Sequence, residues 1–368
     1  MKNIPLQDPK RQYLQLKENI DQQIVAALES GRWLFGENVL AFEKDFATYC
    51  GAELSITVAN GTDAIELSLL AANAKGREVI TVANAGGYTT TACRAMGAIP
   101  VYVDVEEDTL LMSPQAALNA VTSQTAAIVA THLYGRFADI ETLRTGLSSL
   151  QRDDIILIED CAQAHGIEHK GIKGGCFGDI GTFSFYPTKN LGAMGDGGAI
   201  ICNDRTLADQ LQQLRQYGWS KRYQSDIPYG RNSRMDEIQA AILRVKLTYL
   251  DRWNAIRRSI VEKYATSAAG KLQIWHDNSN AFVAHLAIAR HPERDHIREK
   301  LQEAGVTTDI HYPILDCDQP SQVGLPKTVH DLSVSRRTVN EIFTLPCFPE
   351  MSEAEIEYVC RQLSLIST

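Results

Sequence analysis

The chain has 368 residues, of which 44% are hydrophobic and 22% are charged. These are ordinary values for a globular protein, and they exclude a collagen, a disordered chain and a small disulfide-rich domain. The net charge of −9 at pH 7 disfavours a broad basic surface, so we expect no nucleic-acid partner.

Short apolar runs rich in Val and Ile alternate with helix-like segments up to about residue 245. Uniformly apolar runs suit strands that are covered on both faces, as in a parallel sheet. The alternation of strand and helix is typical of an α/β fold. The predicted strands are Leu54–Val58, Val79–Ala83, Val101–Val105, Ala127–Thr131, Ile155–Glu159, Thr182–Phe185 and Ala199–Cys202. The predicted helices between them are Asp63–Ala72, Thr90–Met96, Ser113–Val121 and Ile140–Leu150.

The pattern changes in the last third of the chain. Apolar residues recur every three or four positions over Met235–Ala265, which predicts one long amphipathic helix. The elements expected after it are strands at Ala281–Ala289 and Thr307–Tyr312 and helices at Arg294–Ala304 and Ser352–Leu363. We therefore predict a large α/β domain over residues 1–245, with an N-terminal arm, and a smaller α+β domain over 246–368.

The eight cysteines form no C-x-x-C pair and are mostly flanked by apolar residues. We expect them to be buried free thiols in a reducing compartment. The N-terminus lacks the apolar segment of a signal peptide, and no run approaches the roughly 18 apolar residues of a membrane helix. A cytoplasmic protein with no membrane partner is expected.

One apolar strand ends in two carboxylates, Glu159 and Asp160. Functional groups gather at the carboxyl ends of strands in parallel α/β sheets. A buried aspartate needs a positive partner to offset its desolvation, so Asp160 is a candidate for contact with a ligand. An ion pair within the protein, or a helix cap, is the alternative.

A lysine, Lys189, follows an aromatic strand and precedes the glycine-rich run Gly192–Gly198. Glycines allow the backbone to approach closely. A lysine crowded into such a site can lose its proton near neutral pH and become a nucleophile toward carbonyl groups. An ordinary surface lysine is the alternative.

A third feature follows the strand that ends at Val58. The chain turns through Asn60 and Gly61 into a helix that opens with Thr62 or Asp63. The free N–H groups of a helix start, together with a threonine hydroxyl, suit a phosphate group. A plain N-cap is the alternative.

Together the three features fit pyridoxal phosphate (PLP), which needs a lysine for its aldehyde, an aspartate against its pyridine nitrogen and a phosphate cup. Tyr88, which follows another strand end, is a candidate for stacking on the ring. Other cofactors fit less well. The glycines of Gly175–Gly181 precede a strand and do not open a helix, so they form no dinucleotide fingerprint. His132, His165 and His311 lack metal-ligand spacing, so we expect no metal.

These residues belong to a longer series of motifs. In chain order the motifs are Ile4–Asp8, Gly36 with Phe42 and Glu43, Asn60–Ala64, Asp160–Gly166, Ser184–Lys189, Gly195–Gly198, Asn232–Ala240 and Asp309–Pro313. With them the chain resembles, nearly end to end, the DegT/DnrJ/EryC1/StrS family of sugar aminotransferases. The resemblance implies the fold-type I aminotransferase fold, with a large domain built on a mostly parallel sheet and a smaller α+β domain.

The resemblance also implies roles for single residues. Lys189 would be the lysine bonded to PLP, Asp160 the partner of the pyridine nitrogen, and Gln163 a neighbour of the ring. The residues implied to hold the phosphate are Gly61, Thr62 and Ser184. Asn232 would reach the phosphate of a neighbouring subunit, so that a homodimer shares its sites. A cap on the helix that follows is the alternative for Asn232.

Two departures from the commonest family pattern narrow the substrate. Tyr186 stands where many members have histidine, and Asn84–Tyr88 replaces a more usual run that contains proline. Both changes, with Asp309–Pro313, resemble the branch that aminates the 3-keto group of dTDP-linked 6-deoxyhexoses, with L-glutamate as donor and 2-oxoglutarate as its product. The dTDP-3-amino-3,6-dideoxyhexose formed would serve surface glycans, such as the O-antigen of lipopolysaccharide, or natural products.

The residues implied to contact the sugar or the nucleotide diphosphate are Tyr186, Lys221, His311 and Tyr312. Packing in the small domain is the alternative for His311 and Tyr312, and a solvated loop charge is the alternative for Lys221. Two other functions stay open: an aminotransferase acting on a 4-keto sugar nucleotide or a keto-cyclitol, and a PLP-binding regulator without turnover. Lysine at position 189, where the dehydratases of this family have histidine, favours transamination.

Overall fold

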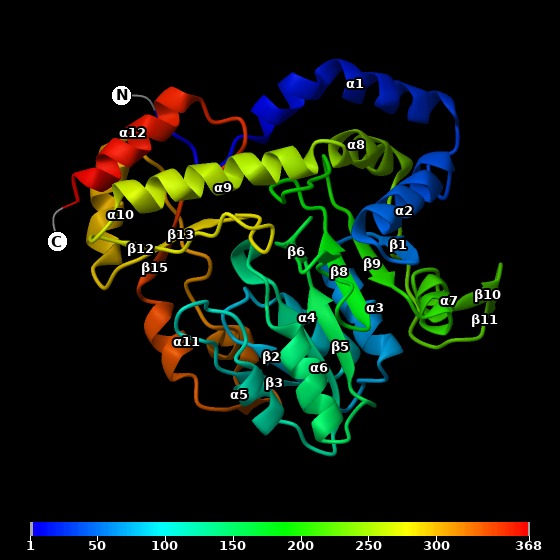
Figure 1. Cartoon of the computed structure of the whole chain (residues 1–368). Helices are drawn as coiled ribbons and strands as arrows, with labels where there is room; N and C mark the ends of the chain where they lie inside the picture. The colour runs from blue at the N-terminus through cyan, green and yellow to red at the C-terminus, as the bar shows by residue number, and fades with distance from the viewer. Residues whose placement is uncertain (1–2, 367–368) are drawn as a thin grey trace.

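The computed structural model describes residues 3–366, and an eight-stranded sheet lies at its centre (Figure 1). The strand order is β1-β9-β8-β5-β4-β2-β3-β14. Neighbours from β8 to β14 are parallel, whereas β9 runs antiparallel to both β8 and β1. The predicted α/β class with a mostly parallel sheet is confirmed. The strands are β1 Leu54–Val58, β2 Glu78–Val82, β3 Ile99–Val103, β4 Thr125–Thr131, β5 Ile156–Asp160, β8 Ile180–Ser184, β9 Gly198–Cys202 and β14 Thr328–Val329.

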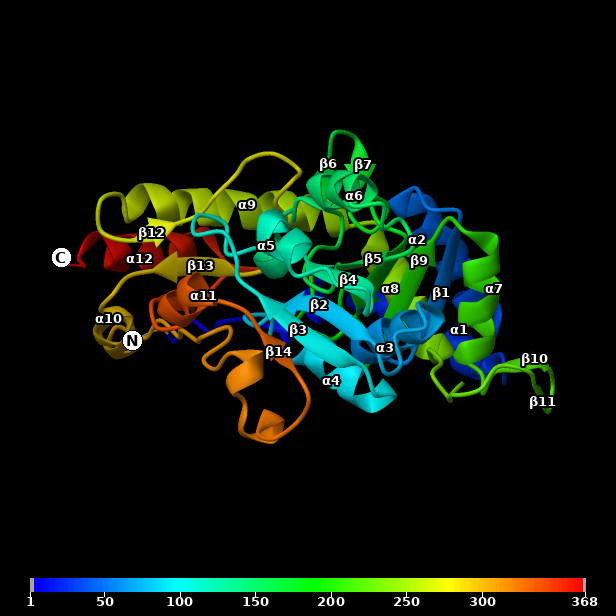
Figure 2. The same cartoon turned by 90° about the horizontal axis from the view of Figure 1, so that it is seen from below.

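The seven predicted strands of this sheet are all present, each within two residues of its expected bounds. Their uniform apolar character reflects burial on both faces, because helices cover the sheet from both sides (Figure 2). Helices α3, α4 and α7 pack on one face, and α5 and α6 on the other. These helices are α3 Gly61–Ala71, α4 Tyr88–Met96, α5 Pro114–Asn119, α6 Ile140–Ser149 and α7 Arg205–Leu214. Strand β14 was not predicted, because its two residues are both exposed and carry no apolar run.

The predicted long helix over Met235–Ala265 is wrong in one respect, because it is two helices. These are α8 (Glu237–Leu247) and α9 (Leu250–Ser267), which lie end to end in Figure 1. At the break the Tyr249 N–H bonds to the carbonyl of Lys246, three residues back, and the Thr248 hydroxyl donates to Val245. These local bonds replace the regular helical ladder for one turn, although the apolar spacing continues through it.

Two of the strands predicted in the last third of the chain are also wrong in part. Only Ala287–Arg290 of the predicted strand Ala281–Ala289 is a strand, β13. The residues before it are buried against the turn Leu133–Gly135, where Val283 donates to the Gly135 carbonyl. The predicted strand Thr307–Tyr312 makes a single bridge, from Asp309 to Thr344. The segment before β13 is apolar because it is buried against that turn, whereas Thr307–Tyr312 is only partly buried and mostly unpaired.

A second sheet has the strand order β12-β13-β15. It packs against α9, α10 and α12 through one shared apolar cluster. The predicted domain boundary at residue 245 falls inside α8. Strand β14 lies beyond that boundary in the chain but pairs with the large sheet. The division into two domains at this residue stays a prediction. The remaining elements are α1 Pro9–Glu29, α2 Glu37–Cys50, β6 Glu168–His169, β7 Ile172–Lys173, β10 Trp219–Lys221, β11 Gln224–Ser225, β12 Gln273–Ile274, α10 Arg294–Glu303, α11 Ser333–Thr338, β15 Ile342–Leu345 and α12 Glu353–Ser364.

All eight cysteines are free, and six of them are buried. Burial raises the pKa of most of these thiols, for example that of Cys93 to about 12, which keeps them protonated. The prediction of free thiols, mostly buried, is therefore confirmed. Over residues 3–366, no helix is both long and apolar enough to cross a membrane.

Candidate active site

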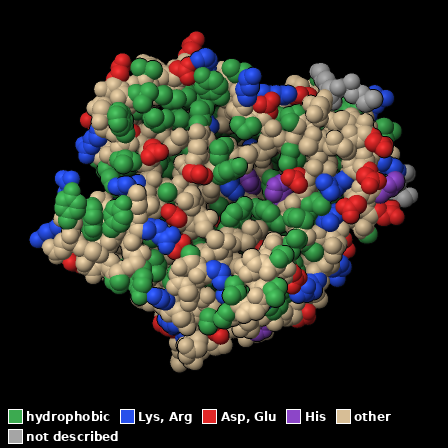
Figure 3. All heavy atoms as spheres, turned by 180° about the vertical axis from the view of Figure 1, so that it is seen from behind, with side chains coloured by type: hydrophobic (Ala, Val, Ile, Leu, Met, Phe, Trp, Pro, Cys, Tyr) green, Lys and Arg blue, Asp and Glu red, His purple; other side chains and the backbone are tan. Residues whose placement is uncertain are grey.

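A cavity of about 530 Å³ lies at the carboxyl edge of the large sheet. The chain segments that follow β1, β2, β5 and β8 reach it, and the segment around residue 311 closes it from the other side. On the face drawn in Figure 3, lysine or arginine and histidine side chains come to the surface near the middle. Nine predicted site residues line the cavity: Gly61, Thr62, Tyr88, Asp160, Ser184, Tyr186, Lys189, His311 and Tyr312.

Asp160 is the last residue of β5, and only 4% of it is exposed. Its Oδ1 accepts from the Ala162 N–H at 3.0 Å, and its Oδ2 accepts a long bond of 3.3 Å from the Thr131 hydroxyl. Burial raises the pKa of Asp160, although the Ala162 N–H and the charge of Lys189 oppose that effect. Neither bonding partner is charged, so the carboxylate fits a cationic N–H in the cavity.

Lys189 lies in the loop after β8, and its N–H donates to the Tyr186 carbonyl. Burial lowers the pKa of its ammonium group to about 8, and the charge of Asp160 acts in the opposite direction. At pH 7 about a tenth of Lys189 is therefore an uncharged amine, the form that a nucleophile or a general base requires, and this fraction rises with pH.

The start of α3 forms the third part of the site. Asn60 caps the helix, since its Oδ1 accepts from the Asp63 N–H at 2.9 Å. The N–H groups of Gly61 and Thr62 lie in the first turn, where the helix offers them no acceptor. A Cβ atom on Gly61 would lie 2.5 Å from the Cβ of Ser184, so only glycine lets the helix start approach the end of β8 this closely. The N–H groups and the Ser184 hydroxyl form a cup that suits a phosphate.

Tyr88 opens α4 after two glycines, Gly86 and Gly87, that both have positive φ. The residue is 45% exposed, and its ring lies edge-on to the ring of Tyr312, with 6.2 Å between the centroids. A Cβ on Gly86 would lie 2.7 Å from the Cζ of Tyr312. The departure from a proline-containing run thus leaves room for the Tyr312 ring.

Gln163 lies behind the cavity wall and orients Tyr312. Its Oε1 accepts from the Tyr134 N–H at 2.7 Å, which fixes the amide, and its Nε2 donates to the Tyr312 hydroxyl at 3.0 Å. The Tyr134 hydroxyl in turn donates to the His311 carbonyl. The structure thus places Gln163 behind Tyr312, and Tyr312 is the residue of this pair that lines the cavity.

The glycine-rich loop Gly175–Gly181 has a structural role. The carboxylate of Glu159 accepts from the N–H groups of Gly175, Phe177 and Gly178 and from His132 Nε2. His132, Glu159 and Cys161 place ligand atoms within 4.8 Å of one another. Both Glu159 oxygens, however, already accept N–H groups, so this cluster is bonded within the protein and offers no free carboxylate to a metal.

Besides Gln163, two predicted residues lie outside the cavity of this chain. Lys221 is exposed on β10. Asn232 is also exposed, and Asp236, not Asn232, stands at the N-cap of α8. The alternative of a helix cap for Asn232 is therefore wrong.

Sequence reasoning missed several residues that line the cavity, above all His285, Gln7 and Asp196. Gln7 stands in the Ile4–Asp8 motif, which was the one available signal for it. His285 sits in an apolar run that reads as a strand, where a histidine gives no sign of facing a cavity.

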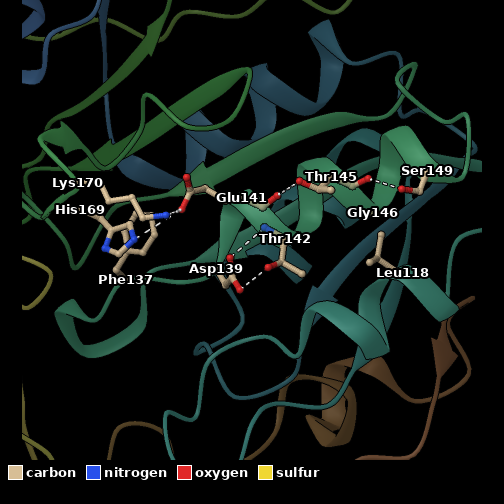
Figure 4. A pocket seen from close by; sticks show the side chains of 10 residues that line it. All are labelled: Leu118, Phe137, Asp139, Glu141, Thr142, Thr145, Gly146, Ser149, His169 and Lys170. Carbon is tan, nitrogen blue, oxygen red and sulfur yellow. Dashed lines mark hydrogen bonds and ion pairs between the residues drawn. The ribbon is translucent and has the colours of Figure 1, made fainter.

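A larger depression, of about 700 Å³, lies on the surface of α5 and α6 (Figure 4). Its polar groups bond to one another: Lys170 donates to Glu141, the Thr142 hydroxyl donates to Asp139, and the Ser149 hydroxyl donates to the carbonyl of Thr145. None of the predicted site residues lines it.

Comparison with known proteins identifies the family of the chain. The model of the DegT/DnrJ/EryC1/StrS aminotransferase family matches residues 14–364. The chain belongs to this family. It is 39% identical to a dTDP-3-amino-3,6-dideoxy-α-D-galactopyranose transaminase of Aneurinibacillus thermoaerophilus, over 97% of each chain. It is 38% identical to the erythromycin biosynthesis sensory transduction protein EryC1 of Saccharopolyspora erythraea, over 98% of this chain and 99% of that one.

A solved structure, S. venezuelae DesV in complex with a ketimine intermediate, superposes with a TM-score of 0.93 at 34% identity, covering 99% of this chain and 98% of that one. The fold-type I aminotransferase fold is thereby confirmed. The protein is a PLP-dependent aminotransferase that acts on nucleotide sugars. The prediction of an enzyme is confirmed.

The residues present fit PLP on three counts. A buried carboxylate lacks a charged bonding partner, a lysine with a lowered pKa lines the same cavity, and the start of α3 offers free N–H groups. When bound, PLP supplies an aldehyde that condenses with amines and a ring that accepts electrons.

Gly61→Ala tests the phosphate cup. We expect the added methyl to push α3 away from Ser184 and to weaken PLP binding to the apoprotein about tenfold or more, as cup hydrogen bonds to a charged group lengthen. Alanine is otherwise the better helix former, so the helix itself should persist. Absorbance titration of the apoprotein with PLP measures the effect.

The matched control repeats Gly61→Ala in a Ser184→Gly background, where the Cβ that it would meet is absent. There only the 3.1 Å approach to the Cα of residue 184 remains, so the added methyl should cost less affinity than it does beside serine. An equal loss of affinity in both backgrounds would show that the contact between Gly61 and Ser184 is not what shapes the cup.

Proposed function

We propose that the protein transfers an amino group from L-glutamate to the 3-keto group of a dTDP-linked 3-keto-6-deoxyhexose. The products are 2-oxoglutarate and a dTDP-3-amino-3,6-dideoxyhexose, a precursor for surface glycans or natural products. The observation that carries the proposal is the joint presence of Lys189, Asp160 and the aromatic pair Tyr186 and Tyr312 in one cavity. The name of the Aneurinibacillus relative supports the 3-amino-3,6-dideoxyhexose, and family resemblance supports glutamate as donor.

Asp160 and Lys189 divide the chemistry. Asp160 holds a proton on the ring nitrogen of the cofactor, because its buried carboxylate gains a cationic partner there. Lys189 Nζ removes the proton from Cα of the amino acid in the first half-reaction and returns a proton to C3 of the sugar in the second. One amine with a pKa of about 8 can serve both directions, since it is neither fully protonated nor weakly basic near neutral pH.

Three side chains at the mouth of the cavity are assigned to the sugar. Tyr186 is 54% exposed, and Tyr312 lies between Tyr88 and the ring of His311. Burial lowers the pKa of His311, whose Nδ1 lies 2.8 Å from the Thr344 hydroxyl. A neutral histidine and tyrosine hydroxyls can donate to and accept from the hydroxyl groups of a hexose.

We further propose that two copies of the chain form a dimer with shared sites. Large apolar side chains are exposed on α1, on α2, on the loop between them and in the segment after β8, as expected of a surface that a second copy covers. They include Leu14, Trp33, Leu40, Tyr186 and Met194. Asn232 and Lys221 lie exposed outside their own cavity, so the partner's cavity is the place assigned to them, at the cofactor phosphate and at the nucleotide diphosphate.

A titration of the holoenzyme tests the substrate. Glutamate should bleach the visible band of the lysine-bound cofactor, and a dTDP-3-keto-6-deoxyhexose should restore it. Restoration by a 4-keto sugar nucleotide or a keto-cyclitol alone would overturn the proposed position of amination while leaving the family intact. Failure of glutamate to bleach the band, with another amino acid succeeding, would overturn the donor.

Mixed dimers test the shared site. Lys189→Ala should lower turnover by more than about 100-fold, because it removes the proton-transfer group. Asn232→Ala should have low activity at limiting PLP concentration, because the substitution removes a hydrogen bond to the charged phosphate of the cofactor. If Asn232 serves the partner's site, unfolding and refolding an equal mixture of the two variants should restore about a quarter of the wild-type rate, since half of the dimers regain one intact site. No recovery in the mixture would contradict the exchange of Asn232 between subunits.

A further inference from the structure

One side chain that lines the cavity has no part in the function proposed above. His285 precedes β13, and 4% of it is exposed. That small exposed surface borders the cavity that Lys189 also lines. The other edge of the imidazole ring faces inward, onto a chain of buried amides.

Two backbone carbonyl groups fix the orientation of those amides. Asn190 Nδ2 donates to the Val283 carbonyl at 2.9 Å and to Asn254 Oδ1 at 2.8 Å. Asn254 Nδ2 donates to the His165 carbonyl at 2.8 Å. A carbonyl oxygen can only accept, so the NH₂ group of each amide faces its carbonyl partner. The Oδ1 of Asn190 must then face the remaining neighbour, His285.

This orientation determines the tautomer of His285. Its Nδ1 lies 2.8 Å from Asn190 Oδ1, an acceptor, so Nδ1 carries the hydrogen. Burial lowers the pKa of His285 well below 6.5, and the charges of Lys189 and Arg257 lower it further. The ring is therefore neutral, and its Nε2 is an unprotonated acceptor.

We propose that His285 is a positioning residue for Lys189: once the substrate has displaced the Lys189 amino group from the cofactor, the unprotonated Nε2 of His285 accepts a hydrogen bond from that group. This assignment rests on the proposed role of Lys189. The Lys189 amino group carries N–H donors in both its charged and its neutral form, and the hydrogen bond from His285 to Asn190, the next residue after Lys189, fixes His285 against the same loop. The hydrogen bond would hold the amine in the cavity during the steps in which it moves protons.

A neutral acceptor suits this task better than a carboxylate would. A carboxylate beside Lys189 would favour the ammonium form and raise its pKa, which would make it a poorer base near neutral pH. A neutral imidazole fixes the direction of the amine with a smaller effect on its charge. Orientation within hydrogen-bond reach of the substrate carbon is what a general base needs.

Two substitutions separate this role from a purely structural one. His285→Asn keeps an NH₂ group near the position of Nδ1, which can still bond to Asn190, but removes the acceptor that faces the cavity. His285→Gln reaches the position of Nε2 with a carbonyl oxygen and gives up the inner bond. A positioning role predicts that Gln retains more activity than Asn, and a structural role predicts the reverse order.

The measurement is the single-turnover rate with glutamate alone, followed through the cofactor absorbance. We expect His285→Asn to slow this half-reaction about 10- to 100-fold, with the glutamate KM within about twofold, and His285→Gln to stay within about tenfold of wild type. A wild-type rate in His285→Asn, or a lower rate in Gln than in Asn, would overturn the proposal.

A second readout uses the wild-type apoprotein and needs no activity. In ¹⁵N-histidine-labelled protein, His285 should show an Nδ1–H tautomer with an unprotonated Nε2 whose shift stays constant from about pH 6 to 9, because its pKa lies below that window. His285→Asn and His285→Gln assign the resonance. An Nε2–H tautomer, or protonation within that range, would overturn the proposal. Because this result does not depend on any sugar substrate, its failure is distinguishable from failure of the proposed function.

Discussion

The site depends on burying two ionisable groups of opposite charge in one cavity without pairing either of them fully within the protein. Burial lowers the pKa of Lys189 to about 8 and raises that of Asp160. Each group lacks a partner that the cofactor can supply: an aldehyde for the amine and a cationic ring nitrogen for the carboxylate. The energetic cost of desolvating these groups in the apoprotein is thus what selects the ligand.

The rest of the fold maintains that arrangement. Parallel strands bring β5 and β8 side by side, so Asp160 and the loop of Lys189 emerge at one edge of the sheet. The glycine at position 61 lets α3 approach β8 closely enough to add a phosphate cup. Behind Asp160, Glu159 is saturated by the loop Gly175–Gly181, which keeps a second carboxylate away from the cavity. Two carboxylates adjacent in sequence therefore have separate roles, one structural and one facing the ligand.

Much of this could be predicted from the sequence because it rests on local patterns. Uniform apolar runs identified the strands of the large sheet, and residues next to strand ends identified Asp160, Lys189 and Gly61. The errors arose where an apolar pattern reports burial but not the hydrogen bonding of the backbone. The segment around Phe282 and Val283 is apolar because it packs against a turn, and the apolar spacing through Thr248 cannot report a break made by local hydrogen bonds. His285 could not be found, because one histidine in an apolar run does not show that it faces a cavity, and its tautomer depends on Asn190 and on the His165 carbonyl, which are far from it in the sequence.

The most direct test of the account is the pKa of Lys189 itself in the apoprotein. It can be measured as the pH dependence of the rate at which a small acylating reagent modifies Lys189, followed by mass spectrometry of the labelled peptide. The account predicts a midpoint of about 8 and a lower midpoint in Asp160→Asn, because the carboxylate stabilises the ammonium form. A midpoint near the value of about 10.4 for a solvated lysine, or one that Asp160→Asn leaves unchanged, would contradict the claim that burial opposite Asp160 sets the reactivity of the site.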